Sequence, residues 1–196
     1  MKKNTKRIVM MASIILTLAI SVAGTLAWLY TEPQVVENTF IPTEVPNKVV
    51  ETFDGTTKTN VKIKNVGNID AYVRASVIAT WAEVDSNGNP THSVYNEKPA
   101  LAMSDLGTDW VYGNDGYYYY TKKVASGDET GVMFSSIALA DNAVKPTAAE
   151  GYDYVLSVEI MGQTIQAEPD SVVGSVWTND FVTVAGNNGI LTVTNK

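Results

Sequence analysis

Apolar and polar side chains alternate along Ala71–Trp81, and this alternation constrains the fold more than any other feature of the sequence. The odd positions are all apolar, and Arg74, Ser76 and Thr80 lie among the even ones. A period of two places the apolar residues on one face of an extended strand, so that one face is expected to be buried. Half-buried strands of this kind are typical of antiparallel sheets.

The chain beyond residue 30 is β-rich throughout, because Val, Thr, Tyr and Ile are frequent and Gly, Asn, Asp and Pro interrupt them. Within Tyr152–Ala167 the apolar residues lie at even positions up to Ile160 and at odd positions from Ile165. This change of parity predicts a β-bulge near Met161–Gly162. Pro169 fits the first turn of a short helix at 169–177. The other predicted strands are 49–53, 59–65, two within 110–122, 132–139, 152–167 and 190–194; residues 91–109 and 140–150 are predicted to be loops. We therefore predict an all-β fold, an antiparallel β-sandwich with one short helix.

The N-terminus has the layout of a secretory signal peptide. Four basic residues within the first seven precede the uncharged run Ile8–Leu29. Removal of a signal peptide at 1–27 requires cleavage after Ala27, with Thr25 and Ala27 in the small pockets of a signal peptidase. Trp28 would be the new N-terminus of a chain of 169 residues. The alternative is a permanent anchor, since the apolar run is long enough to span a bilayer.

Charge and composition narrow the classes of function. The formal net charge of −7 would become −11 without the basic head, which disfavours nucleic acid and anionic lipid as partners. Cysteine is absent, so disulfides, thiol nucleophiles and cysteine-containing metal sites are excluded. We expect a secreted protein of the extracellular matrix or cell surface, without a cofactor, that touches the membrane only through the uncleaved signal segment.

The sequence offers little catalytic chemistry. His92 is the single histidine, and no His-Glu-x-x-His motif is present, whereas a catalytic zinc needs two or three imidazoles. Asp85-x-Asn87-x-Asn89 resembles the start of a calcium loop, but Pro90 replaces the expected glycine, so we interpret it as turn chemistry. We therefore predict that the protein is not an enzyme and has no catalytic residues and no metal site.

Aromatic residues leave two interpretations open. They form either a sugar-stacking platform or part of the core, where the run Tyr117–Tyr120 would place two rings on each face of a strand. Arg74 is interpreted as a solvated or tyrosine-stacked side chain. The candidate platform comprises Trp81, Trp110, Tyr112 and Tyr117–Tyr120.

Several segments, in this order, resemble the TasA/camelysin family of Gram-positive bacteria, whose precursors are processed by SipW-type signal peptidases. The segments are Gly24–Leu29, Glu37–Phe40, Glu51–Asn68, Ala71–Arg74, Tyr118–Lys122 and Ile165–Pro169. The resemblance implies a jelly-roll-like β-sandwich at 47–196 that is secreted and deposited as a subunit of a biofilm matrix fibre. It also implies a SipW-type signal peptidase as a partner during export.

In fibres of that family the freed N-terminal segment adds as a strand to the next subunit, which here implies a donor within 28–46. Trp28, Tyr30, Val36 and Phe40 share one parity, with Val35 as an extra apolar residue. The prolines of Ile41–Pro46, where the family has Thr and often Gly, limit how far pairing extends past Phe40. The same residues could instead form the domain's own first strand or a frayed terminus.

Two other functions remain as alternatives. One is a monomeric cell-surface module that binds a glycan or a host protein through residues 82–116. The other is a camelysin-like metalloprotease, which only the resemblance suggests.

Overall fold

The computed structural model describes residues 43–196. The residues expected at the cleavage site and in the donor strand (Thr25, Ala27, Trp28, Tyr30, Val35, Val36 and Phe40) therefore lie outside the described part of the chain. The described part belongs to one compact unit, residues 41–196.

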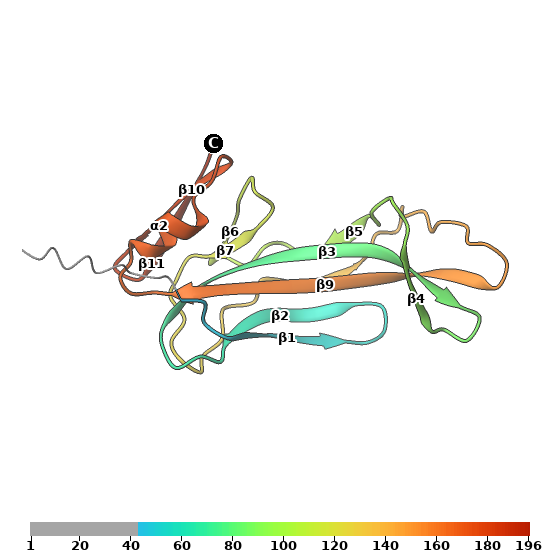
Figure 1. The fold of residues 1–196 in the computed structure, drawn as a ribbon, viewed down its shortest axis with the longest axis horizontal. Helices are drawn as coiled ribbons and strands as arrows, with labels where there is room; N and C mark the ends of the chain where they lie inside the picture. The colour runs from blue at the N-terminus through green and yellow to red at the C-terminus, as the bar shows by residue number, and fades with distance from the viewer. Residues whose placement is uncertain (1–42) are drawn as a thin grey trace, which may run out of the picture. The chain divides into compact units, whose positions relative to one another are not determined.

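The described residues form antiparallel sheets and one short helix (Figure 1), which confirms the mostly-β expectation. One sheet has the strand order β1 (Asn47–Phe53), β2 (Lys58–Asn65), β8 (Phe134–Leu139) and β5 (Leu101–Met103). The second has the order β4 (Pro90–Val94), β3 (Ala71–Asp85), β7 (Tyr118–Tyr120) and β6 (Trp110–Tyr112), with β9 (Tyr152–Gln166) also paired to β3. The helix α2 (Val172–Trp177) leads into a hairpin of β10 (Val182–Asn187) and β11 (Ile190–Asn195).

Strands β3 and β9, with 15 residues each, are the longest strands of the second sheet. They pair without interruption from Ala71 opposite Gln166 to Asp85 opposite Tyr152, with no shift in register. The prediction of a bulge near Met161–Gly162 is therefore wrong. The apolar parity changes because β9 is covered on both faces near its end, so Ile160 and Ile165 enter different cores.

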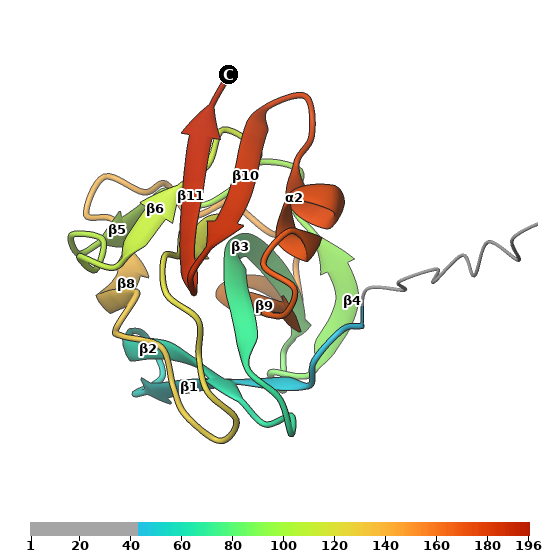
Figure 2. The ribbon, with the colours of Figure 1, turned by 90° about the vertical axis from the view of Figure 1, so that its left-hand side faces the viewer.

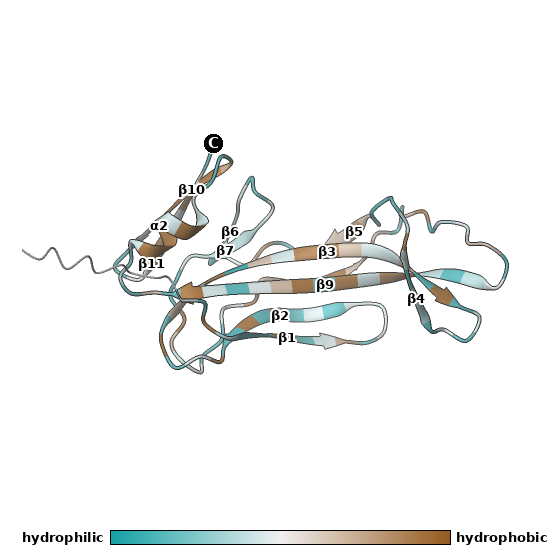
Figure 3. Cartoon of the chain, viewed as in Figure 1, coloured by the Kyte–Doolittle hydropathy of each residue, from teal (hydrophilic) through white to brown (hydrophobic). Residues whose placement is uncertain are grey.

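Figure 2 shows α2, β10 and β11 on one side of β3. Two hydrophobic cores result from the arrangement of the sheets and this C-terminal part. The first lies between the two sheets and contains Val61 and Ile63 of β2, Val73 of β3 and Ile160 of β9. The second lies on the other face of β3, where Tyr72 packs under α2, β10 and β11. Figure 3 shows hydrophobic segments along β9 and on α2, which contribute to these cores.

Three strands were not predicted, and two of them, β4 and β5, are short or lack a clean period. β4 overlaps the predicted loop 91–109, β5 lies inside it, and the third strand is β10. β4 alternates weakly and is almost fully exposed, and β5 has three residues, so neighbouring strands rather than local preference determine both. The helix begins at Val172, later than expected, with the Val172 N–H donating to the carbonyl of Pro169.

Candidate functional site

One edge of β9 is paired along its whole length, whereas most of the other edge is open. Near Gln166 the open side is occupied by the first described residues: the Val45 N–H donates to the Thr164 carbonyl over 3.2 Å, and the Gln166 N–H donates to the Thr43 carbonyl over 3.3 Å. Backbone groups alternate between the two edges of a strand, so the N–H and C=O groups of the even residues from Gln166 back to Tyr154 all point to this open side. Among residues 43–196, no strand pairs with this edge between Tyr152 and Met161.

The open edge carries little of the protection that natural edge strands have. Asp153 and Glu159 are the two charged residues of Tyr152–Met161, and the segment contains no proline. Edge strands are usually shielded by charges, prolines or bulges, because their unpaired N–H and C=O groups otherwise accept another strand. This edge is therefore suited to accept one.

A groove of about 420 Å³ runs beside the open edge. Leu156 and Val158 of β9 form one wall together with Trp81 of β3, and apolar residues of β8 and the β1–β2 hairpin form the other. The remaining residues that line it include Phe53, Lys58, Ile137, Leu139, Lys145 and Tyr154. It opens between the two sheets, so a strand added to β9 would bury its inward side chains there.

The groove ends where β1 is fastened to β9. The side-chain amide of Asn47 donates to the Gly162 carbonyl (3.2 Å) and to the Thr164 hydroxyl (3.1 Å). A Cβ at position 162 would lie 2.7 Å from Asn47 Oδ1, so a larger residue there would displace the Asn47 side chain. β1 and β9 are thus held together near Gly162, and the groove lies farther toward Tyr152, between Phe53 and Tyr154–Val158.

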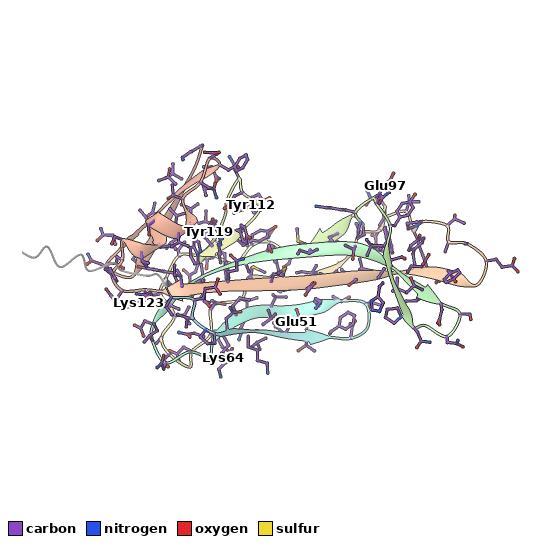
Figure 4. The ribbon with its side chains drawn as sticks, viewed as in Figure 1. Glu51, Lys64, Glu97, Tyr112, Tyr119 and Lys123 are labelled. Atoms are coloured by element: carbon purple, nitrogen blue, oxygen red, sulfur yellow. The ribbon has the colours of Figure 1, made fainter. Side chains whose placement is uncertain are left out.

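A charged pair lies on the inner face of the β1–β2 hairpin. Glu51 has the same parity as Val49, which packs against the first core, and Phe53, which lines the groove. Lys58 Nζ forms an ion pair with Glu51 Oε1, and the two side chains are 15% and 19% exposed respectively. The second oxygen, Oε2, is buried and has no hydrogen-bond partner among the described residues. Figure 4 labels Glu51 on this hairpin.

Arg74 occupies a second polar cluster, on the outer face of β3. Its guanidinium lies 4.0 Å from the ring centre of Tyr117 and 5.0 Å from that of Trp177. It donates to the Gln163 side chain (2.9 Å) and the Tyr119 hydroxyl (3.2 Å). Of the two interpretations of Arg74, the tyrosine-stacked one is confirmed, since only 14% of its side chain is exposed. The cluster joins β3 to β7, β9 and α2.

The Arg74 cluster predicts a loss of stability at alkaline pH. Burial, together with the hydrogen bond that the Tyr119 hydroxyl donates to Asp115, raises the pKa of Tyr119 from 10.0 to about 12. Because the folded-state pKa is raised, the stabilisation is fully present below pH 10 and is lost as the pH rises from about 10 to 12. The pKa values of Tyr72 and Tyr118 are raised as well, mainly by burial, and act in the same direction.

We expect the urea concentration at the unfolding midpoint to decrease as the pH is raised from 10 to 12. In Tyr119→Phe this decrease with pH should be less steep. A midpoint that stays constant up to pH 12, or an identical slope in the variant, would contradict this assignment.

The aromatic residues proposed as a sugar platform do not come together. Trp81, Trp110 and Tyr120 are buried on the inner face of the second sheet, whereas Tyr119 belongs to the second core. Tyr112 is exposed and stacks on Tyr118 at 4.8 Å between ring centres. Figure 4 shows Tyr112 and Tyr119 near the C-terminal hairpin, away from Glu51. The predicted split of Tyr117–Tyr120 between two faces is confirmed, and the interpretation as core holds for Trp81, Trp110, Tyr119 and Tyr120. Tyr117 and Tyr118 are partly buried and pack against the second and first core respectively.

The polar loop 85–99 contains turn chemistry. Asp85 Oδ1 accepts the N–H groups of Asn87 (2.8 Å) and Asn89 (2.9 Å), which confirms the interpretation as a turn. His92 is exposed, with a φ of 64°. Within residues 43–196 no group of three or more His, Asp or Glu side chains could hold a metal ion. In that same part of the chain no helix is long and apolar enough to cross a membrane.

Comparison of the chain with family models, with curated proteins and with solved structures found no match.

The open edge of β9 was missed by sequence reasoning, although one signal was available. The run Tyr154–Ile160 alternates cleanly like a half-buried strand, yet its outward positions carry only one charge.

Proposed function

We propose that this protein is a secreted structural subunit of an extracellular biofilm matrix fibre, in which each subunit receives the N-terminal segment of a neighbour as an added strand. Its two facing sheets would then constitute a jelly-roll-like β-sandwich of the TasA/camelysin type. The observation that carries the proposal is the edge of β9 with which no strand of residues 43–196 pairs between Tyr152 and Met161, beside an apolar groove. An edge of this kind gives affinity through backbone hydrogen bonds and specificity through pockets for alternate side chains.

The candidate donor matches the dimensions of the open edge. The run from Gln34 to Ile41 lies between Pro33 and Pro42, so all of its residues can donate backbone hydrogen bonds. Its eight residues span about 27 Å at roughly 3.4 Å per residue, and the open edge from Tyr152 to Met161 has ten. Val36 and Phe40 would enter the groove, and each stabilises the joint by about 1.5–3 kcal/mol before ordering costs.

The direction of the chain favours a donor from another copy. Thr43–Val45 run antiparallel to β9 and are attached at its Gln166 end, whereas the groove lies toward Tyr152. The residues that precede Thr43 are therefore connected to the domain at the end of β9 opposite the groove. A donor and an acceptor at opposite ends make a heterologous contact, which generates an open filament when the rotation between successive copies does not close into a ring.

Electron microscopy of the processed chain, residues 28–196, beside the uncut precursor tests this function. We expect filaments from the processed form only, because the donor is free only after cleavage. A chain that also lacks residues 28–40 should stay folded and monomeric. Fibres from that shortened chain would disprove strand addition by this segment.

The same preparations separate the alternatives. Monomers under all conditions would favour a surface module that binds a glycan or a host protein through residues 82–116. Hydrolysis of casein or gelatin that a chelator stops would favour the metalloprotease.

A further inference from the structure

The outer face of the second sheet carries a row of exposed apolar side chains away from the groove. Ala82 pairs with Val94 of β4 on one side and with Val155 of β9 on the other, so these three side chains lie side by side across the sheet. Figure 1 shows the C-terminal hairpin at one end of β3 and β9 and β4 at the other. We call the outward side chains between them the outer patch, which also includes Ser76, Ile78, Thr80, Val84, Pro90, Asp153, Ser157, Glu159 and Met161.

The outer patch is more apolar than the solvent-facing side of a sheet usually is. The outward residues of a half-buried antiparallel sheet are normally polar. Here Val94 and Val155 are 59% and 41% exposed, and Ile78 and Met161 are 40% and 45% exposed. Proteins rarely leave a contiguous apolar surface of this kind without a partner. The outer patch therefore has the composition of an interaction surface.

The distribution of charge points to a second copy of this chain as the partner. Residues 43–196 contain 19 acidic and ten basic side chains, so two copies repel each other over most of their surfaces. Within the outer patch Asp153 forms an ion pair with Lys145 over 2.7 Å, which leaves Glu159 as the one unpaired charge there. This face therefore lets two acidic copies approach each other with little repulsion.

The size of the outer patch limits how strongly two single copies can associate. From Ser76 to Val84 it extends about 27 Å along β3, and its two to three strands are about 10–14 Å wide. Two such faces bury at most about 800 Å² together, which is less than the roughly 1,000 Å² of a stable specific interface. Single subunits would stay apart, whereas filaments that align many patches would associate through the sum of weak contacts.

We infer that filaments of this chain pair side by side through the outer patch, each copy packing this face on the same face of a second copy. This inference rests on the proposed function, because single subunits have too little contact area to pair. A two-fold axis through the central row, Thr80 and Ser157, keeps the two Glu159 carboxylates apart. It sets each of them over an apolar residue of the second copy, either Val155 or Ile78.

Ile78→Glu in the processed chain tests this pairing, since Ile78 lies directly opposite Glu159 in the outer patch. The two adjacent carboxylates of each copy should repel those of the other, so the fraction of filaments that pellets as bundles at low speed should fall at least about tenfold. The critical concentration for filament formation should stay within about twofold, because Ile78 does not line the groove. Electron microscopy should show single filaments.

The matched control is Ser135→Glu, which adds the same charge at an exposed position of β8 in the first sheet. Its filaments should form bundles like those of the unmodified chain. Added salt should favour bundles of the unmodified chain, because it screens the negative charge of the copies. Bundles that dissolve as the salt concentration rises would overturn the inference, since attraction between opposite charges would then hold them together.

A cross-linking experiment locates the contact. The sequence contains no cysteine, so a single introduced cysteine can be cross-linked selectively. Thr80→Cys lies in the central row, and a short bismaleimide should therefore convert its bundled filaments into covalently linked copies only when a second cysteine, at Ser157, is also present or when Thr80 faces itself. Either product should disappear when Ile78→Glu is added, whereas a contact within one filament would survive that change. Ser135→Cys should give no linked copies.

Single filaments from the unmodified chain, or equal bundling of Ile78→Glu and Ser135→Glu, would overturn the inference while filament formation still supported the proposed function. Failure of the unmodified chain to form filaments would overturn both.

Discussion

Leu156→Lys is expected to abolish assembly of the processed chain while the domain stays folded. Leu156 is half-buried, lies opposite Trp81 of β3 and lines the groove beside the open edge. A lysine there would direct a charge into the space that a donor's apolar side chains must fill, the same device by which natural edge strands prevent pairing. An uncompensated buried charge that costs about 3 kcal/mol would weaken assembly roughly a hundredfold.

The fold itself should tolerate this change, because the groove is open to solvent and the lysine ammonium can reach water in the free subunit. The matched control is Met161→Lys, which adds the same charge to the exposed outer face of the same strand, away from the residues that line the groove, and should assemble normally. Sedimentation and electron microscopy measure assembly, and urea unfolding measures the free energy of unfolding. Normal fibres from Leu156→Lys would rule out the groove as the acceptor.

Trp177→Ala is expected to lower the free energy of unfolding by about 3–5 kcal/mol. Trp177 is 4% exposed, lies in the second core and packs edge-on against Tyr119 at 5.8 Å between ring centres. Its ring also faces the guanidinium of Arg74. α2 has six residues and no side-chain hydrogen bond at its N-cap, so packing rather than intrinsic helix stability holds it in place.

Val176→Ala is the control, because Val176 lies next to Trp177 on the same helix and is 44% exposed. It should change the free energy of unfolding by less than about 0.5 kcal/mol. Urea denaturation of the two variants gives the comparison. A loss of under about 1 kcal/mol for Trp177→Ala would mean that the C-terminal hairpin does not depend on this side chain.

The sequence predicted those features that depend on near neighbours in the chain. The period of two in Ala71–Trp81 correctly identified β3 and its buried face, and the same reasoning divided the rings of Tyr117–Tyr120 between two faces. The Asp85 turn could be interpreted because a carboxylate bonds to backbone N–H groups only two and four residues away. In each case the interaction is complete within a few residues, so the local pattern is sufficient.

Arg74 and the β9 phase change show where local reasoning stops. Arg74 stands among polar neighbours on an expected wet face, but residues about 40 and 100 positions later in the chain bury it. The bulge near Met161–Gly162 was predicted to explain the changed parity of Ile165, because a single buried face was assumed. Two cores on opposite faces of one sheet cannot be distinguished from a bulge by parity alone.

The amino-acid sequence determined that the chain forms antiparallel strands with defined inner faces, because side-chain alternation is a local property. Only the tertiary structure decided where the groove lies and, within residues 43–196, which strand edge stays open and which carboxylate oxygen lacks a hydrogen-bond partner. Those features depend on which distant strands pair with one another, and pairing is set by packing between segments more than one hundred residues apart, such as Asn47 and Gly162.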